Sequence, residues 1–163
     1  MIRLAAIVIL LAAPAWAEED ALVYSSSATE ACLVEGKGDE CIGLSAGQCM
    51  EETPGGYSTY GMGGCLSREA DYWDARLNTA YQDLMAKARE ADQFNAENQI
   101  GAASQADALK NMQRAWIPYR DARCEYEYSL WGGGTGGGPA SVSCFMQMTA
   151  EQALYLEAGG ALY

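Results

Sequence analysis

The sequence contains no histidine, the side chain that most often serves as a general base or a metal ligand in proteins. Histidine-dependent catalytic triads and histidine-ligated metal sites are therefore excluded. The sequence also lacks a Cys-x-x-Cys spacing and an Asp-x-Asp-x-Asp-Gly loop, so neither a zinc site nor an EF-hand calcium site is indicated. We predict no catalytic residue, no cofactor and no metal, and hence a protein that is not an enzyme.

Basic residues are few relative to acidic ones. Ten Lys and Arg residues stand against 22 Asp and Glu residues, which gives a formal net charge of −12. A surface of this charge repels nucleic acid and anionic membranes, and it attracts basic proteins. The composition therefore predicts no nucleic-acid partner and favours a basic protein partner, while solubility alone is the other interpretation of the charge.

Long apolar runs are absent after the first 17 residues, which themselves have the organisation of a secretory signal peptide. Arg3 supplies a basic start, residues 4–13 are apolar, and Ala15-Trp16-Ala17 is a small-x-small cleavage site. The apolar run is too short to span a bilayer. We predict that residues 1–17 are removed, and that the mature chain is periplasmic or secreted without a membrane anchor. The loss of Arg3 changes the formal net charge from −12 to −13.

The six cysteines all follow the predicted signal peptide, and an even number in an oxidising compartment predicts three disulfides. Each proposed pair flanks a short glycine-containing connection, so its two cysteines can meet when the connection turns back. The predicted pairs are Cys32–Cys41, Cys49–Cys65 and Cys124–Cys144.

Helical periodicity dominates the mature chain. One long helix is predicted over residues 66–90, where apolar side chains recur at intervals of three and four. These are Leu66, Ala70, Trp73, Leu77, Tyr81, Leu84 and Ala88. A second helix, over residues 109–124 and on to about residue 128, is predicted as the centre of the fold, with Trp116 as its core anchor and a kink at Pro118. Its predicted inward face holds Leu109, Met112, Trp116, Tyr119 and Arg123.

Shorter helices are predicted over residues 28–35, 39–51 and 143–158, and no segment alternates apolar and polar side chains as a strand does. The predicted fold is all-α: a small disulfide-stapled helical domain with two long antiparallel helices, a C-terminal helix and an N-terminal short helical hairpin. The predicted division places the signal peptide at 1–17, the cysteine-rich hairpin and a Gly/Tyr loop at 18–64, the helical domain at 65–158 and a tail at 159–163.

Two glycine-rich segments, residues 52–64 and 132–138, are predicted as loops. Each is interpreted either as a structural staple closed by its flanking cysteines or as a surface that contacts a partner. Gly132, Gly134 and Gly137 match Gly-x-Gly-x-x-Gly, but a predicted helix precedes them, so a dinucleotide site is rejected. The candidate partner contacts in and beside the two loops are Tyr57, Tyr60, Trp131 and Thr135. Tyrosine suits such a role because it contributes a large contact area at low entropic cost.

Arg120 lies just after the Trp116-Ile-Pro segment and has two interpretations. It forms a structural ion pair with a helix carboxylate, for example Asp74, or it belongs to a ligand pocket.

The run from Gln113 to Cys124, preceded by Asp74-Ala-Arg-Leu-Asn78 and Tyr81, resembles the LprI-type lysozyme inhibitor N-terminal domain family of bacterial envelope proteins. The resemblance extends from Cys65 to about Glu157. Its motif residues are Asp74, Leu77, Asn78, Tyr81, Gln113, Trp116, Tyr119, Arg120 and Asp121. Family members often carry an arginine where this chain has Gln152.

The resemblance implies an exported protein whose partner is a basic lysozyme that it inhibits. The competing hypothesis is a structural or adaptor protein of the cell envelope that has no lysozyme activity.

Overall fold

The computed structural model describes residues 22–160; the predicted signal peptide and the last three residues lie outside this range. The described part is all-α, as predicted, and it contains no strand. Its elements are α1 (Ser27–Val34), the 3₁₀ turn η1 (Gly38–Cys41), α2 (Leu44–Glu52), α3 (Thr59–Glu97), α4 (Gln105–Ser129) and α5 (Gly137–Glu157). No helix in residues 22–160 is both long and apolar enough to cross a membrane.

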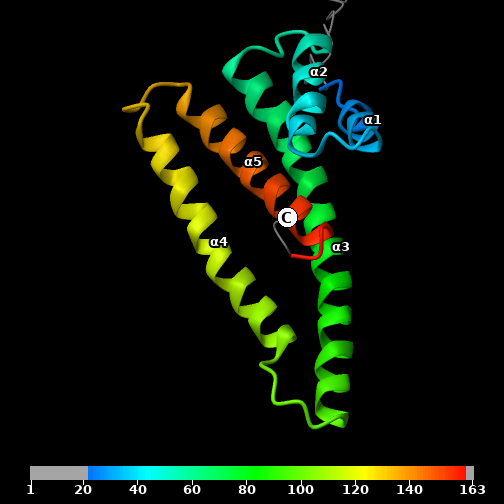
Figure 1. Cartoon of the computed structure of the whole chain (residues 1–163). Helices are drawn as coiled ribbons and strands as arrows, with labels where there is room; N and C mark the ends of the chain where they lie inside the picture. Colours follow the sequence, from blue (N-terminus) through cyan, green and yellow to red (C-terminus); the bar gives the residue numbers. More distant parts are fainter. Residues whose placement is uncertain (1–21, 161–163) are drawn as a thin grey trace, which may run out of the picture.

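Figure 1 shows α3 and α4 as the arms of a long antiparallel hairpin. Helix α5 lies between their upper halves, and α1 and α2 pack beside the start of α3. The apolar stripe predicted for residues 66–90 faces this core, and its Trp73 is 0% exposed. On α5, Met146, Ala150, Ala153 and Leu156 supply the opposing buried surface.

The central role predicted for residues 109–124 is wrong, because α3 and its Trp73 hold that position. Helix α4 runs through Pro118, and its Tyr119 is 60% exposed while Trp116 is half-buried. The buried residues of α4 are Leu109, Gln113 and Cys124. Leu109, Met112 and Trp116 of the predicted face pack on the core, whereas Tyr119 and Arg123 are exposed. Beyond Trp116 the inward positions belong instead to Arg120 and Cys124.

Helices α3 and α5 begin earlier than predicted. Helix α3 starts at Thr59 because Ser58 Oγ accepts the N–H of Gly61 at 3.0 Å, which caps the helix. Residues 59–64 are therefore helical, and the predicted Gly/Tyr loop is wrong for that part. Helix α5 starts at Gly137 and holds Pro139 in its first turn, where proline's missing N–H has no intrahelical partner to lose.

The three disulfides of the structure have the predicted pairing. Cys32–Cys41 joins α1 to η1, Cys49–Cys65 joins α2 to α3, and Cys124–Cys144 joins α4 to α5. Their Cα atoms lie 5.4–5.7 Å apart, within the normal range for a disulfide. Each bond thus connects neighbouring elements of the chain.

A buried carboxylate attaches the N-terminal helices to α3. Glu69 of α3 is 0% exposed and accepts hydrogen bonds from Thr29 Oγ1 (3.0 Å), Gly43 N (2.8 Å), Ala46 N (2.6 Å) and Trp73 Nε1 (3.0 Å). Two of these donors are backbone N–H groups at the start of α2, so Glu69 caps that helix from another element.

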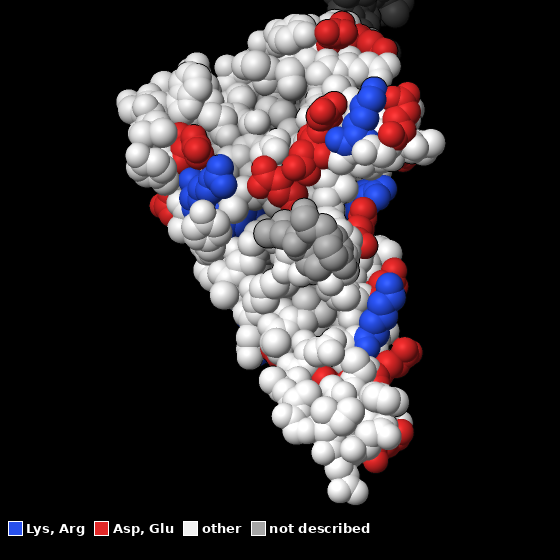
Figure 2. Space-filling model, in the orientation of Figure 1, with Lys and Arg blue, Asp and Glu red and all other residues white. Residues whose placement is uncertain are grey.

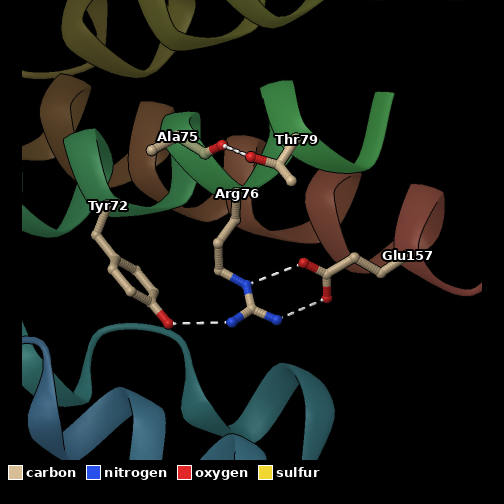
Figure 3. Close-up of polar contacts among 5 residues, drawn as sticks. All are labelled: Tyr72, Ala75, Arg76, Thr79 and Glu157. Carbon is tan, nitrogen blue, oxygen red and sulfur yellow. Dashed lines mark hydrogen bonds and ion pairs between the residues drawn. The ribbon is translucent and has the colours of Figure 1, made fainter. Parts of the chain in front are cut away.

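Two further polar contacts, both partly exposed to solvent, connect α3 to α5 and α3 to α4. Arg76 of α3 forms a bidentate pair with Glu157 of α5, with N–O distances of 2.9 and 2.8 Å, and also donates to the Tyr72 hydroxyl (Figure 3). The hydrogen bond to Glu157 raises the pKa of Arg76 above its ordinary value. Near the far end of α3, Asp92 accepts from Ser104 Oγ and from the first N–H groups of α4.

Candidate functional site

One groove between α3 and α4 collects most of the residues that carry the family resemblance. Its volume is about 410 Å³, which is within the size range of small-ligand sites. It is lined by Asp74, Leu77, Asn78 and Tyr81 of α3 and by Lys110, Gln113, Arg114, Trp116, Ile117 and Arg120 of α4. We call it the α3–α4 groove. Seven of the nine motif residues line it.

The α3 wall of the groove is polar at one end. Asn78 Nδ2 donates to Asp74 Oδ2 at 2.9 Å, a contact between residues one helical turn apart. This hydrogen bond orients both side chains. It leaves the second carboxylate oxygen of Asp74 and the amide oxygen of Asn78 without a hydrogen-bond donor among residues 22–160.

The α4 wall is fixed from behind by α5. The buried Gln113 accepts a hydrogen bond from Gln152 Nε2 at 2.6 Å. The guanidinium of Arg120 lies 4.9 Å from the ring centroid of Trp116 and 4.9 Å from that of Phe145, so it is sandwiched between α4 and α5 aromatics. Gln152 thus contributes to the support of the groove.

The ion pair suggested between Arg120 and Asp74 is absent. Arg120 donates instead to its neighbour Asp121, through Nε at 3.0 Å and Nη2 at 2.9 Å. Stacking between Trp116 and Phe145 holds the guanidinium there. Of the two motif residues outside the groove lining, Asp121 therefore orients Arg120, and Tyr119 projects into solvent.

Three groove residues were not singled out from the sequence: Lys110, Arg114 and Ile117. Their spacing of four and three residues places them on one face of α4. A pair of cations one turn apart is a detectable signal in a chain this acidic, although it does not by itself indicate a groove.

The four predicted partner contacts lie at one end of the molecule, away from the α3–α4 groove. The turn before α3 and the connection between α4 and α5 both lie at the top of Figure 1. Tyr57 is 63% exposed, Tyr60 73% and Trp131 52%. Thr135 is also exposed. We call the exposed set Tyr57, Tyr60, Tyr128, Leu130 and Trp131 the aromatic end.

Trp131 also fixes the glycine-rich connection before α5. Its ring lies against Gly136, where any Cβ would collide with it, and its carbonyl accepts the N–H of Gly134 at 2.8 Å. The Tyr128 ring lies 3.1 Å from the position of a Cβ at Gly137. These close approaches leave little room for a Cβ at Gly136 and Gly137, and they pack the glycine-rich segment against Trp131 and Tyr128.

Figure 2 shows the charged side chains on one face of the molecule. On the face shown in Figure 2, carboxylates lie along the edge formed by α3 and over the α1–α2 region, with a few basic side chains among them. Within residues 22–160, no group of three or more His, Cys, Asp or Glu side chains is arranged to hold a metal ion.

The described residues define a class of protein: a small all-helical domain cross-linked by three disulfides, with a polar groove between its long helices. Residues 49–156 match the model of the family described as lysozyme inhibitor LprI. The match covers more than half of the chain, and the chain therefore belongs to this family.

Two relatives are bacterial proteins without a described activity. The chain is 29% identical over 119 residues to an uncharacterized 17.7 kDa protein of Rhodobacter capsulatus, a match that covers 72% of this chain and 73% of the relative. It is 29% identical over 93 residues to an uncharacterized protein of Rhizobium meliloti, covering 57% of this chain and 67% of the relative. No solved structure is significantly similar to the chain.

Proposed function

We propose that this protein is an exported protein-binding module that inhibits a basic lysozyme through its aromatic end. The observation that carries the proposal is the exposure of Tyr57, Tyr60 and Trp131 at one end of a rigid, disulfide-bonded domain. Membership of the lysozyme inhibitor family supports the choice of partner. The three disulfides support an oxidising compartment such as the periplasm.

Aromatic side chains are enriched in the cores of protein interfaces, and they lose little conformational entropy when a partner covers them. Tyr57 lies in the hydrogen-bonded turn before α3, so its backbone is held, and the Trp131 ring packs on glycine backbone, so this side chain is held before any partner binds. A surface already ordered avoids part of the cost of association.

The net charge of −12, which becomes −13 when the predicted signal peptide is removed, adds long-range attraction toward a basic enzyme. Such attraction increases the association rate constant more than it slows dissociation, and salt screens it. Inhibition is therefore expected to be slower to develop, and weaker, at high ionic strength.

The test is a lysozyme activity assay with the purified, oxidised protein against several lysozymes, at low and high salt. The double variant Tyr57→Ala/Tyr60→Ala should weaken inhibition by about tenfold or more, since truncation of a central interface aromatic costs about 2 kcal/mol. Phe94→Ala is the matched control, because Phe94 is equally exposed but lies near the opposite end of α3.

Unchanged inhibition by the double variant would remove Tyr57 and Tyr60 from the mechanism. Failure to inhibit any lysozyme would contradict the proposed partner. The structural or adaptor role in the envelope would then become the leading hypothesis, with periplasmic pull-down as its test.

A further inference from the structure

The α3–α4 groove has no role in the proposed inhibition, yet its walls carry opposite charges. Asp74 lies on the α3 wall, and Lys110 and Arg114 lie on the α4 wall. The lining also includes the side chains of Leu77, Tyr81, Trp116 and Ile117, which are apolar or aromatic. We propose that the groove binds a small zwitterion with an apolar body, namely a short peptide with free ends or a free amino acid.

The cationic wall is the first argument. Lys110 and Arg114 are one helical turn apart, so their charges repel each other. Neither has an ion-pair partner among residues 22–160, although acidic residues outnumber basic ones by more than two to one in this chain. A ligand carboxylate between the two side chains removes this repulsion, and the arginine fork can bind it through two parallel hydrogen bonds.

The acidic wall is the second argument. Asp74 is oriented by Asn78 and keeps one carboxylate oxygen free, and Asn78 keeps its amide oxygen free. These are acceptors, suited to the hydrogens of an ammonium group. A simple anion would gain from Lys110 and Arg114 but would be repelled by Asp74, whereas a zwitterion satisfies both walls.

The floor of the groove is the third argument. Trp116 is held by the stacked Arg120, and Leu77 is buried in the core, so the apolar surface between the charged walls is fixed before a ligand enters. Gln113 is held by Gln152 through its carbonyl oxygen, which leaves its amide N–H groups available as donors. Such a floor suits an aliphatic or aromatic side chain and a peptide carbonyl.

The experiment is a nuclear magnetic resonance titration of the full oxidised protein that follows the Trp116 indole N–H signal. The probes are the tripeptide Ala-Phe-Ala with free ends, its N-acetylated form, its C-amidated form and free phenylalanine. We expect saturable binding of the free-ended tripeptide. Blocking either end should lower the affinity about threefold, since an ion pair near the surface contributes a few-fold in affinity. Comparison with free phenylalanine decides whether the site favours a peptide or an amino acid.

Paired variants make the assignment specific. Arg114→Gln should lower the affinity for the free-ended tripeptide about threefold but leave the affinity for the C-amidated form unchanged. The reason is that the variant and the amide remove the same contact. Asp74→Asn should likewise lower the affinity for the free-ended tripeptide but leave the affinity for the N-acetylated form unchanged. Lys87→Gln is the control, since it removes one positive charge from α3 outside the groove.

Equal binding of free and blocked peptides would overturn the proposal, as would losses in the two variants that do not depend on which end is blocked. The absence of any shift in the Trp116 signal with all four probes would also overturn it. Lysozyme inhibition is measured with different variants at a different surface, so either proposal can fail while the other stands.

Discussion

Glu69 shows how one residue can determine the position of two helices. A carboxylate without solvent contact is costly to bury unless its oxygens accept several hydrogen bonds. Glu69 accepts four, and two come from the positive end of the α2 helix dipole. No lysine or arginine forms an ion pair with it in residues 22–160, so backbone and side-chain dipoles stabilise the charge.

We expect Glu69→Ala to lower the free energy of unfolding by about 3–5 kcal/mol, because four buried donors lose their acceptor. Glu69→Gln should lower the free energy of unfolding by less. Its amide keeps one acceptor oxygen, but its NH₂ group then faces a donor that previously bonded to the other carboxylate oxygen. Urea denaturation provides the measurement. The control is Glu90→Ala, an exposed glutamate of the same helix, which should change stability by less than about 0.5 kcal/mol. Equal effects of Glu69→Ala and Glu90→Ala would contradict this account.

At the scale of the element, the first turns of α3 contain Gly61 and Gly63, whose replacement by alanine should have opposite effects on stability. A Cβ at Gly61 would lie 2.5 Å from the Gly55 carbonyl oxygen and 2.6 Å from Gly56 Cα, and backbone atoms cannot rotate away. A Cβ at Gly63, two residues further along the helix, would meet nothing within 4 Å. The first glycine allows the turn and helix to touch, while the second only weakens the helix.

Gly61→Ala should therefore destabilise the protein by about 1–3 kcal/mol through overpacking. Gly63→Ala should stabilise it by about 0.5–1 kcal/mol through helix propensity. Thermal melts of the two variants beside the parent protein check both signs at once. A destabilised Gly63→Ala protein would contradict the open space that the structure shows around this position.

Asp92 connects α3 to the first turn of α4 and predicts a dependence of stability on pH. The hydrogen bond from Ser104 and two backbone N–H groups hold the pKa of Asp92 below its ordinary value of 3.8. The folded state therefore binds this proton less readily than the unfolded chain, so the stabilisation is present above about pH 4 and is lost as pH falls through the folded-state pKa. Asp92→Asn should flatten this acid-side loss in urea denaturation curves. Asp83→Asn, an exposed carboxylate on the same helix, should leave the slope unchanged.

Sequence patterns predicted those elements whose buried faces are apolar. The α3 stripe was identified because most of its inward positions hold apolar side chains. The disulfide pairs followed from cysteines that flank glycine-containing connections. The face of α4 was predicted only in part, because Gln113 and Arg120 occupy inward positions. Their partners Gln152 and Phe145 come from α5, which the local pattern of α4 cannot show. The burial of Glu69 was missed for the same reason, although its position three residues after Leu66 and four before Trp73 lies on the stripe.

On the scale of the whole molecule, the covalent cross-links make stability depend on oxidation. Each disulfide joins elements that already pack together, so its loss mainly increases the freedom of the unfolded chain. Replacement of Cys124 and Cys144 by serine should lower the free energy of unfolding by about 2–4 kcal/mol. Reductant should lower the melting temperature of the parent protein further than that of this variant. A melt that does not respond to reductant would contradict the presence of the three disulfides.

The positions of these disulfides have a consequence for the covalent continuity of the chain. None of the three connects a residue before 98 to a residue after 104, and residues 99–103 are exposed where they join α3 to α4. A single proteolytic cut there should therefore yield two fragments that separate on a denaturing gel even without reductant. Before denaturation, the α3–α5 packing and the Arg76–Glu157 pair should hold these fragments together. The two segments on either side of residues 99–103 therefore each contain both cysteines of every disulfide that they carry. They can be expressed as separate chains, and their reassembly can be tested by mixing.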